Sequence, residues 1–292
     1  MIKKILFLLA LAGIAFSGFV AFLINKMINR PSLAAEKQLA DQDYEKFSAT
    51  NENGHLIQGY FYRGDPENGT VILCHGHGVA HGHMDDMVAF LRKAGLNIIL
   101  FDFRAHGKSQ GRLCTIGYNE WKDIKCILEK AKEKGLISKN AKIAAYGRSM
   151  GAASLINGSA ELYDIDAFIL ESSFERLRKI AARDAWHNLK IPDTPVTDLA
   201  FWIIDHLTSI PYSQNNPVEK IAGIATRPAM LIHDGLDHRA NFESFAALKA
   251  ELPSAEEMIA SEARHVQAHK VLNDEFEARL LDFLERAGVL KN

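Results

Sequence analysis

The strongest chemical signal in the sequence is the segment G-R-S-M-G at residues 147–151. It follows an apolar run at 142–146, which we expect to be a strand, and precedes a run of small residues at 152–158, which we expect to be a helix. Glycine on both sides permits a tight turn, because a Cβ there would collide with the neighbouring strand or helix. Such a turn exposes the hydroxyl of Ser149 and points a helix N-terminus toward it. The segment therefore predicts a nucleophilic serine, with a plain strand-to-helix turn as the alternative.

A second segment, C-H-G-H-G at residues 74–78, ends another expected strand. A His-Gly-x-Gly sequence at this position lets a backbone N–H turn inward and donate to a developing oxyanion. We expect the donors to be the N–H groups of His77 and Met150. The alternative is a metal site, because histidines and aspartates cluster there: His75, His77, His81, His83, Asp85 and Asp86. No strict ligand spacing appears among them, and we expect neither a metal nor a cofactor.

The segment F-D-F-R-A-H-G-K-S at residues 101–109 completes a recognisable set. Together with segments 75–78 and 147–151, in this order, it resembles the α/β-hydrolase superfamily. More narrowly, the chain resembles the single-anchor bacterial serine hydrolases described as lysophospholipase-, monoacylglycerol-lipase- or serine-aminopeptidase-like. The resemblance covers about residue 43 to the C-terminus. It implies that the loop at 102–109 braces the oxyanion loop and takes no direct part in catalysis.

The resemblance also implies an acid after the next-to-last strand and a histidine after the last. Asp237 and His265 match these two positions, and Ser149, Asp237 and His265 follow one another in the order this fold requires. His265 would remove the serine proton, Asp237 would orient the imidazole, and water would release an acyl-enzyme. Asp234 stands where a glycine is commoner, and we expect it to be dispensable. His269 is the fallback base.

The elements that must position these residues alternate along the chain. Two alternating runs at 44–50 and 56–62 predict a hairpin. Strands are then expected at 71–74, 97–101, 142–146, 167–170, 229–232 and 256–260, with helices at 84–93, 120–132, 152–158, 242–250 and 274–287. This alternation predicts an α/β-hydrolase fold, a mainly parallel, doubly wound sheet.

One stretch, at 172–227, is too long for a plain connection between two strands. It contains two helical patterns, at 174–189 and 196–209, and predicts a small helical cap inserted over the sheet. We expect Trp186, Phe201 and Trp202 to form the core of this cap, with an acyl pocket lined by Trp202 or Phe201 as the alternative. A roof this small favours esters of short to medium acyl chain, since each buried methylene is worth about 0.8 kcal/mol.

The N-terminus reads as a separate unit. Lys3 and Lys4 precede an apolar run at 5–24, and 20 helical residues span about 30 Å, the thickness of the hydrocarbon layer. We therefore expect a membrane anchor with its flanks at 1–30, a linker at 31–42 and the hydrolase domain at 43–292. A cleaved signal peptide is the alternative. An uncleaved anchor with a short N-terminal tail would place the catalytic domain on the extracytoplasmic side.

Composition excludes several classes of protein. The 292 residues carry a formal net charge of −2, with no basic excess to neutralise phosphates, so we expect no nucleic-acid partner. The three cysteines form no disulfide pattern. The chain is thus expected to be a membrane-anchored, carboxylesterase- or lipase-like serine hydrolase acting on a small ester, a class that includes lipid-derived esters. The alternatives are a serine exopeptidase or amidase, a lysophospholipase or monoacylglycerol lipase, and a non-catalytic scaffold.

Overall fold

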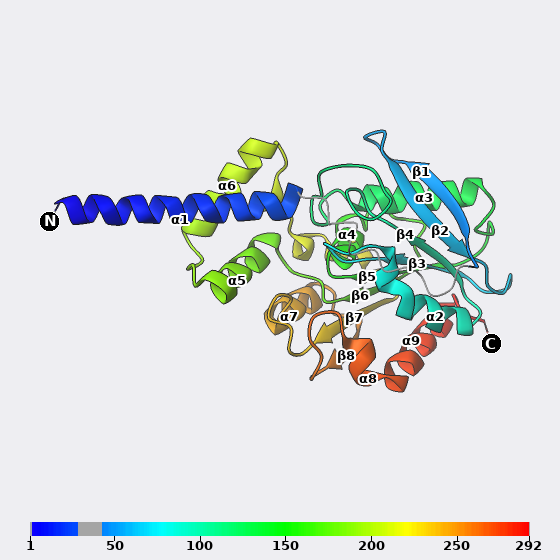
Figure 1. Ribbon diagram of the computed structural model, residues 1–292. Coiled ribbons are helices and arrows are strands. Elements are labelled where there is room, and N and C mark those ends of the chain that lie inside the picture. The colour runs from blue at the N-terminus through cyan, green and yellow to red at the C-terminus, as the bar shows by residue number, and fades with distance from the viewer. Residues whose placement is uncertain (1, 29–42, 292) are drawn as a thin grey trace.

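From residue 43 onward, strands and helices alternate as expected and build one eight-stranded sheet (Figure 1). The computed structural model describes residues 2–28 and 43–291. The strands are β1 (Glu45–Thr50), β2 (Leu56–Tyr62), β3 (Thr70–Cys74), β4 (Asn97–Phe101), β5 (Ile143–Arg148), β6 (Ala167–Glu171), β7 (Ala229–Asp234) and β8 (Glu256–Ala260). Their order is β1-β2-β4-β3-β5-β6-β7-β8, antiparallel at β1-β2 and β2-β4 and parallel elsewhere. The predicted mainly parallel sheet is confirmed.

Helices cover both faces of this sheet, which explains why its central strands are apolar throughout. Side chains alternate between the faces: Ile72 on β3 packs with α3 (Trp121–Glu133), α4 (Met150–Asn157) and α7 (Phe242–Glu251). Its neighbours Val71 and Leu73 pack with α2 (Asp85–Lys93) and α9 (Asp274–Arg286) on the other face. A short helix that the sequence analysis missed, α8 (Ala268–Leu272), precedes α9. The two cores hold the strand ends, and therefore the loops that follow them, in fixed positions.

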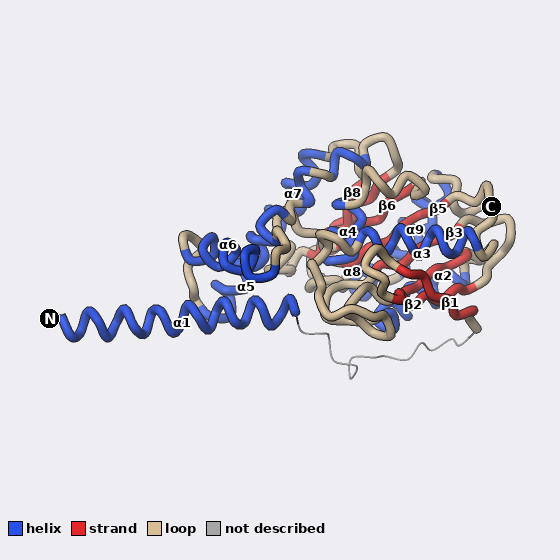
Figure 2. Tube along the Cα trace, turned by 90° about the horizontal axis from the view of Figure 1, so that it is seen from above, coloured by secondary structure: helices blue, strands red, loops and turns tan. Residues whose placement is uncertain are grey.

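The predicted cap forms two helices, α5 (Leu177–Leu189) and α6 (Val196–Thr208), at one end of the molecule (Figure 2). Phe201 lies in its core, as expected. Trp186 and Trp202 do not: they are 56% and 58% exposed, so this expectation was wrong. The reason is helical geometry, since a helix buries residues at spacings of three and four, and each tryptophan follows a buried residue by a single position.

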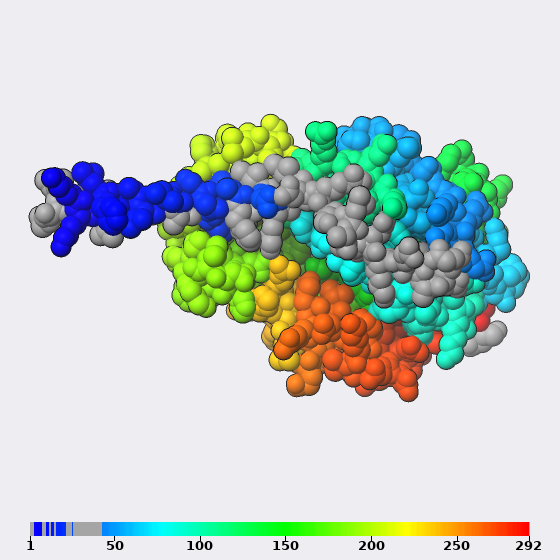
Figure 3. Space-filling view, in the orientation of Figure 1, coloured from blue at the N-terminus to red at the C-terminus, as the bar shows by residue number. Residues whose placement is uncertain are grey.

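Helix α1 (Ile2–Ile28) lies against one side of the cap and extends beyond it, away from the sheet (Figures 1 and 3). Phe19 and Val20 are buried in the same apolar cluster as Phe201. Among the described residues, no helix has the length and apolarity that a membrane span requires, so the predicted membrane anchor finds no support. The predicted linker at 31–42 lies outside the described residues.

The turn between β5 and α4 packs directly on the end of β3, as the two flanking glycines suggest. A Cβ on Gly151 would lie 2.1 Å from the carbonyl oxygen of Cys74. A Cβ on Gly147 would lie 2.6 Å from the backbone nitrogen of Ala152. Both contacts involve main-chain atoms, which cannot rotate aside as a flexible side chain would. Glycine at these positions is therefore what allows the serine turn to sit on the sheet.

We predict that Gly151→Ala destabilises the fold by about 1–3 kcal/mol or more, because the added methyl overlaps a backbone carbonyl in a packed interior. Urea unfolding of the purified chain measures this loss. Gly76→Ala is the matched control, since a Cβ there meets Arg148 and Ser149 only at 3.6 and 3.7 Å. Equal stability of the two variants would contradict the close-packing argument.

Candidate active site

Ser149 occupies the turn that the sequence predicts, between strand β5 and helix α4. Its backbone has φ 53° and ψ −111°, a conformation that residues with a side chain rarely adopt. Its N–H donates to the carbonyl oxygen of Glu171 at 2.9 Å, which ties the turn to strand β6. The strained backbone lifts the hydroxyl out of the sheet and leaves it partly exposed.

The structure brings Ser149, His265 and Asp237 together in one hydrogen-bonded series. The Ser149 hydroxyl lies 3.0 Å from His265 Nε2, and His265 Nδ1 lies 2.5 Å from Asp237 Oδ2. Burial raises the pKa of Asp237, but the hydrogen bond and charge of His265 outweigh this effect and lower it. The Asp237 carboxylate also accepts the N–H groups of Arg239 and Ala240 at 2.9 and 3.2 Å. It is therefore ionised and fixed in the orientation that an imidazole N–H requires.

The expected oxyanion donors lie on two segments that meet at Ser149. Met150 is the first residue of α4, and the first N–H groups of a helix have no partner within it. His77 belongs to the loop that follows β3, whose Gly76 lies against the side chain of Ser149. The buried ring of His75 holds this loop through Gly76 O at 2.7 Å and Phe103 N at 3.0 Å. Burial lowers the pKa of His75 to about 3, so it is neutral and structural.

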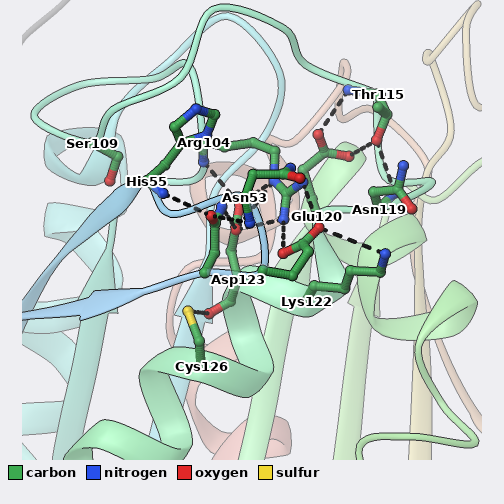
Figure 4. Close-up of polar contacts among 12 residues, drawn as sticks. Asn53, His55, Arg104, Ser109, Thr115, Asn119, Glu120, Lys122, Asp123 and Cys126 are labelled. Carbon is green, nitrogen blue, oxygen red and sulfur yellow. Dashed lines mark hydrogen bonds and ion pairs between the residues drawn. The ribbon is translucent and has the colours of Figure 1, made fainter. Parts of the chain in front are cut away.

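The loop at 102–109 braces the oxyanion loop, as the family resemblance implies. Gly78 donates its N–H to His106 Nε2 at 3.2 Å, and Asp102 accepts the N–H of His81 at 2.8 Å. Arg104 fixes the loop from the other side through its buried ion pair with Asp123 at 2.7 Å (Figure 4). The brace is therefore a set of buried, paired polar groups and not a flexible connection.

A cleft of about 480 Å³ opens over Ser149. It is lined by Gly76, His77, Val79, His83, Met84, Asp86, Arg148, Ser149, Arg239, His265, Val266, His269 and Lys270. Arg148 contacts Asp86 at 2.8 Å and Glu171 at 3.0 Å, so it orients these two carboxylates. His269 Nε2 also lies 2.8 Å from Asp86. The fallback base is thus engaged by a different carboxylate, and only His265 reaches the serine.

Sequence reasoning missed the role of Asp234. Its fully buried carboxylate accepts the N–H groups of Val266 and Gln267, at 2.9 and 3.2 Å, and the hydroxyl of Ser172. Val266 is a β-branched residue at φ 58°, directly after His265. Burial and the nearby charge of Glu171 raise the pKa of Asp234 to about 6, so the carboxylate is the major form at neutral pH. Asp234 therefore holds the loop that carries His265, and only the long-range contact reveals it.

The histidines that cluster in the sequence have separate surroundings in the structure. The ring of His75 contacts the backbone of Gly76 and Phe103. The Nδ1 atom of His81 lies 2.9 Å from Asp102 Oδ1. Among the described residues, one group brings its donor atoms within 4.8 Å of one another: His77, His106 and Cys114. Cys114 is far from the other two along the chain, and no sequence spacing could have indicated this group.

Comparison with known proteins identifies the family. Residues 65–257 match the family model described as serine aminopeptidase, S33. The chain belongs to this family. The S33 assignment and the architecture together confirm the predicted α/β-hydrolase fold.

Curated relatives of this S33 protein are distant. The uncharacterized protein YfhR of Escherichia coli K12 is 27% identical over 66% of this chain and 63% of its own length. The uncharacterized protein YqkD of Bacillus subtilis is 23% identical over 76% of this chain and 74% of its own. The chain thus spans about 63% of the length of the E. coli relative that it matches.

Solved structures extend the likeness. The Pf2001 esterase of Pyrococcus furiosus is 28% identical, with a TM-score of 0.72, over 90% of this chain and 98% of that one. The α/β hydrolase GrgF of a Penicillium species shares the fold at 18% identity, with a TM-score of 0.67, over 84% and 98% of the two chains. This chain therefore belongs to the S33 family, has the α/β-hydrolase fold and has an esterase among its structural neighbours.

We predict that Asp234→Asn lowers kcat for ester hydrolysis by about 10- to 100-fold, because a loosened loop misplaces His265 by a fraction of an ångström or more. KM should change little, since Asp234 does not line the cleft. Steady-state kinetics measure both constants, and Asp282→Asn on the exposed face of α9 is the control. A wild-type kcat in the Asp234 variant would restore the original expectation that this residue is dispensable.

Proposed function

We propose that this chain is a serine hydrolase that cleaves carboxylic esters of short to medium acyl chain. Ser149 is the nucleophile, His265 the general base and Asp237 the carboxylate that orients the base. The observation that carries the proposal is the hydrogen-bonded series from the serine hydroxyl through the imidazole to Asp237, at 3.0 and 2.5 Å, beneath an open cleft. The 28% identity to an esterase of the same fold supports the reaction class.

The chemistry follows from the position of each group. His265 takes the hydroxyl proton as the oxygen of Ser149 attacks the acyl carbon, and Asp237 stabilises the imidazolium that forms. The N–H groups of His77 and Met150 receive the charge that develops on the carbonyl oxygen. The imidazolium then protonates the leaving alcohol. Water, activated by the same histidine, releases the acid and restores the serine.

An ester suits the cleft better than a peptide with a free amino terminus. An aminopeptidase needs an available carboxylate to receive the substrate ammonium group. Among the described residues that line the cleft, Asp86 is the single carboxylate. Both of its oxygens are engaged by Arg148, and one also by His269. The family name alone therefore does not argue for aminopeptidase activity in this chain.

The size and lining of the cleft favour a short or medium acyl group. Val79, Met84 and Val266 supply apolar surface, but charged side chains line much of the remainder. Each methylene buried against the apolar part adds about 0.8 kcal/mol, and methylenes beyond it gain nothing from the polar rim. Binding should therefore improve over the first carbons and then level off.

A lysophospholipid-type ester is the second candidate. Lys270 lines the same cleft and is exposed, whereas Arg148 and Arg239 are paired with Asp86 and Asp184. The ammonium group of Lys270 would attract a negatively charged group on the alcohol part of an ester. An anionic ester hydrolysed faster than its neutral analogue at low salt would favour this candidate.

We predict that a fluorophosphonate probe labels Ser149 and that Ser149→Ala abolishes labelling. Ser149→Ala and His265→Ala should each lower kcat/KM by several orders of magnitude, and the double variant by little more, because the groups act as a unit. His269→Ala is the matched control for His265→Ala, since it removes a nearby imidazole bound to Asp86. Labelling that survives in Ser149→Ala would contradict the assignment, and an unreactive wild-type chain would indicate a non-catalytic scaffold.

We further predict that kcat/KM rises from acetyl to medium p-nitrophenyl esters and levels off by about twelve acyl carbons, a length whose full burial would be worth about 10 kcal/mol. Aminoacyl anilides should be poor substrates, because Asp86 is already engaged. A panel of graded esters run beside the anilides measures both. A rate that climbs steadily with longer chains, or anilides that outrun the esters, would count against this substrate class.

A further inference from the structure

Nitrogen and sulfur atoms that can bind a metal ion converge beside the two residues of the proposed oxyanion hole. Ring nitrogens of His77 and His106 and the sulfur of Cys114 all lie within 4.8 Å of one another. The Met150 thioether lies 3.4 Å from the same Cys114 sulfur. We propose that His77, His106, Cys114 and Met150 form a binding site for a monovalent copper ion and that copper at this site inhibits the hydrolase.

The ring of His106 is already oriented as a metal ligand. Its Nδ1–H donates to the carbonyl oxygen of Arg104 at 2.8 Å, while Nε2 accepts the N–H of Gly78 at 3.2 Å. Both contacts require the tautomer with an unprotonated Nε2. A ligating histidine commonly has its second nitrogen held by a backbone carbonyl in this way. The lone pair on Nε2 is therefore available to a metal ion in exchange for one backbone hydrogen bond.

Hydrogen bonds also fix the position of the Cys114 sulfur and of the backbone around it. Ile116 donates its N–H to the sulfur at 3.3 Å, and it does so from φ 52°, a strained conformation for a β-branched residue. Buried Glu120 fixes the intervening Thr115 through its N–H at 2.7 Å and its hydroxyl at 2.6 Å (Figure 4). Tyr212 donates to the Cys114 carbonyl at 2.9 Å. An N–H bond to sulfur is one of the contacts that tune metal-bound thiolates.

The donor types favour copper(I). Thiolate and thioether sulfur select soft ions, and imidazole also suits copper, whereas zinc sites use thiolate and imidazole without a thioether. Donors on one ion, at about 2.0–2.3 Å from it, lie about 3.3–3.8 Å apart. The present separations of up to 4.8 Å thus need a closure of about 1 Å. On binding, the Cys114 thiol loses its proton to solvent and the sulfur bonds to copper, with no change in oxidation state.

The position of the site determines both how copper reaches it and how bound copper affects the hydrolase. His77 is half-buried and lines the catalytic cleft, which provides the entry path. Copper on His106 takes the lone pair that now holds Gly78, the residue next to His77 in the oxyanion loop. Copper on the Met150 side chain also pulls on the residue that carries the other proposed donor. Occupancy should therefore distort the oxyanion hole and lower turnover.

The test measures binding without substrate. The purified full chain is titrated anaerobically with copper(I) against the chromophoric chelator bicinchoninate. We expect one chelator-resistant copper per chain, bound at least 100-fold more weakly in Cys114→Ala and in Cys114→Ser. Cys126→Ala is the matched control, because that sulfur lies on α3 and donates to the Asp123 carbonyl. Circular dichroism verifies that each variant is folded.

X-ray absorption at the copper edge on the wild-type chain keeps the proposal testable if the variants fail to fold. It should show sulfur at about 2.2–2.3 Å together with imidazole nitrogen. Absence of stoichiometric copper, unchanged binding in a folded Cys114 variant, or a spectrum without sulfur overturns the site. Zinc bound as tightly as copper and unaffected by Met150→Leu overturns the choice of metal.

A separate arm measures ester hydrolysis with and without copper. We expect about tenfold inhibition in the wild type and none in Cys114→Ala. This arm alone rests on the proposed function, so an inactive chain that still binds copper would refute the esterase proposal and leave the metal site standing. Full activity of the copper-loaded wild type would overturn the inhibition.

Discussion

The close approach of helix α4 to the end of strand β3 is the constraint on which the whole site depends. It exists because Gly151 has no Cβ to collide with the Cys74 carbonyl. The contact brings the start of a helix, with its unpaired N–H groups, beside the loop that follows β3. Ser149 and both proposed oxyanion donors therefore share one small volume. A substitution that separates the two backbones would disassemble all three functions together.

Buried polar groups then hold the remaining parts in register. Asp237 contacts His265, Asp234 holds the backbone just after it, and Arg104 with Asp123 anchors the loop beneath the proposed oxyanion donors. Buried ion pairs contribute little net stability, because desolvation offsets much of their attraction. Their value here is positional, since leaving any one partner unpaired in the interior is costly. The site is thus rigid where the chemistry needs alignment.

The same crowding of loops around Ser149 explains the copper site. The 102–109 loop comes close in order to brace Gly78, and the turn after it carries Cys114 toward Met150. Four donors converge because three loops are packed around one strand end, and no local pattern selects them. Metal binding would therefore move the same backbone segments that catalysis needs in place. This links the two proposed activities.

The sequence by itself determined the alternation of strands and helices and the two helices of the cap, which depend on local apolar runs. It predicted Ser149 from its flanking glycines, and it predicted Asp237 and His265 from the resemblance to a known family. Only the tertiary structure decided which acid meets which base, what Asp234 does, and which face of each cap helix is buried. Such contacts join distant segments, as Arg148 and His269 do across 121 positions. A sequence pattern shows the periodicity of a single helix or strand. The contact partner of a side chain depends on how several helices and strands pack together.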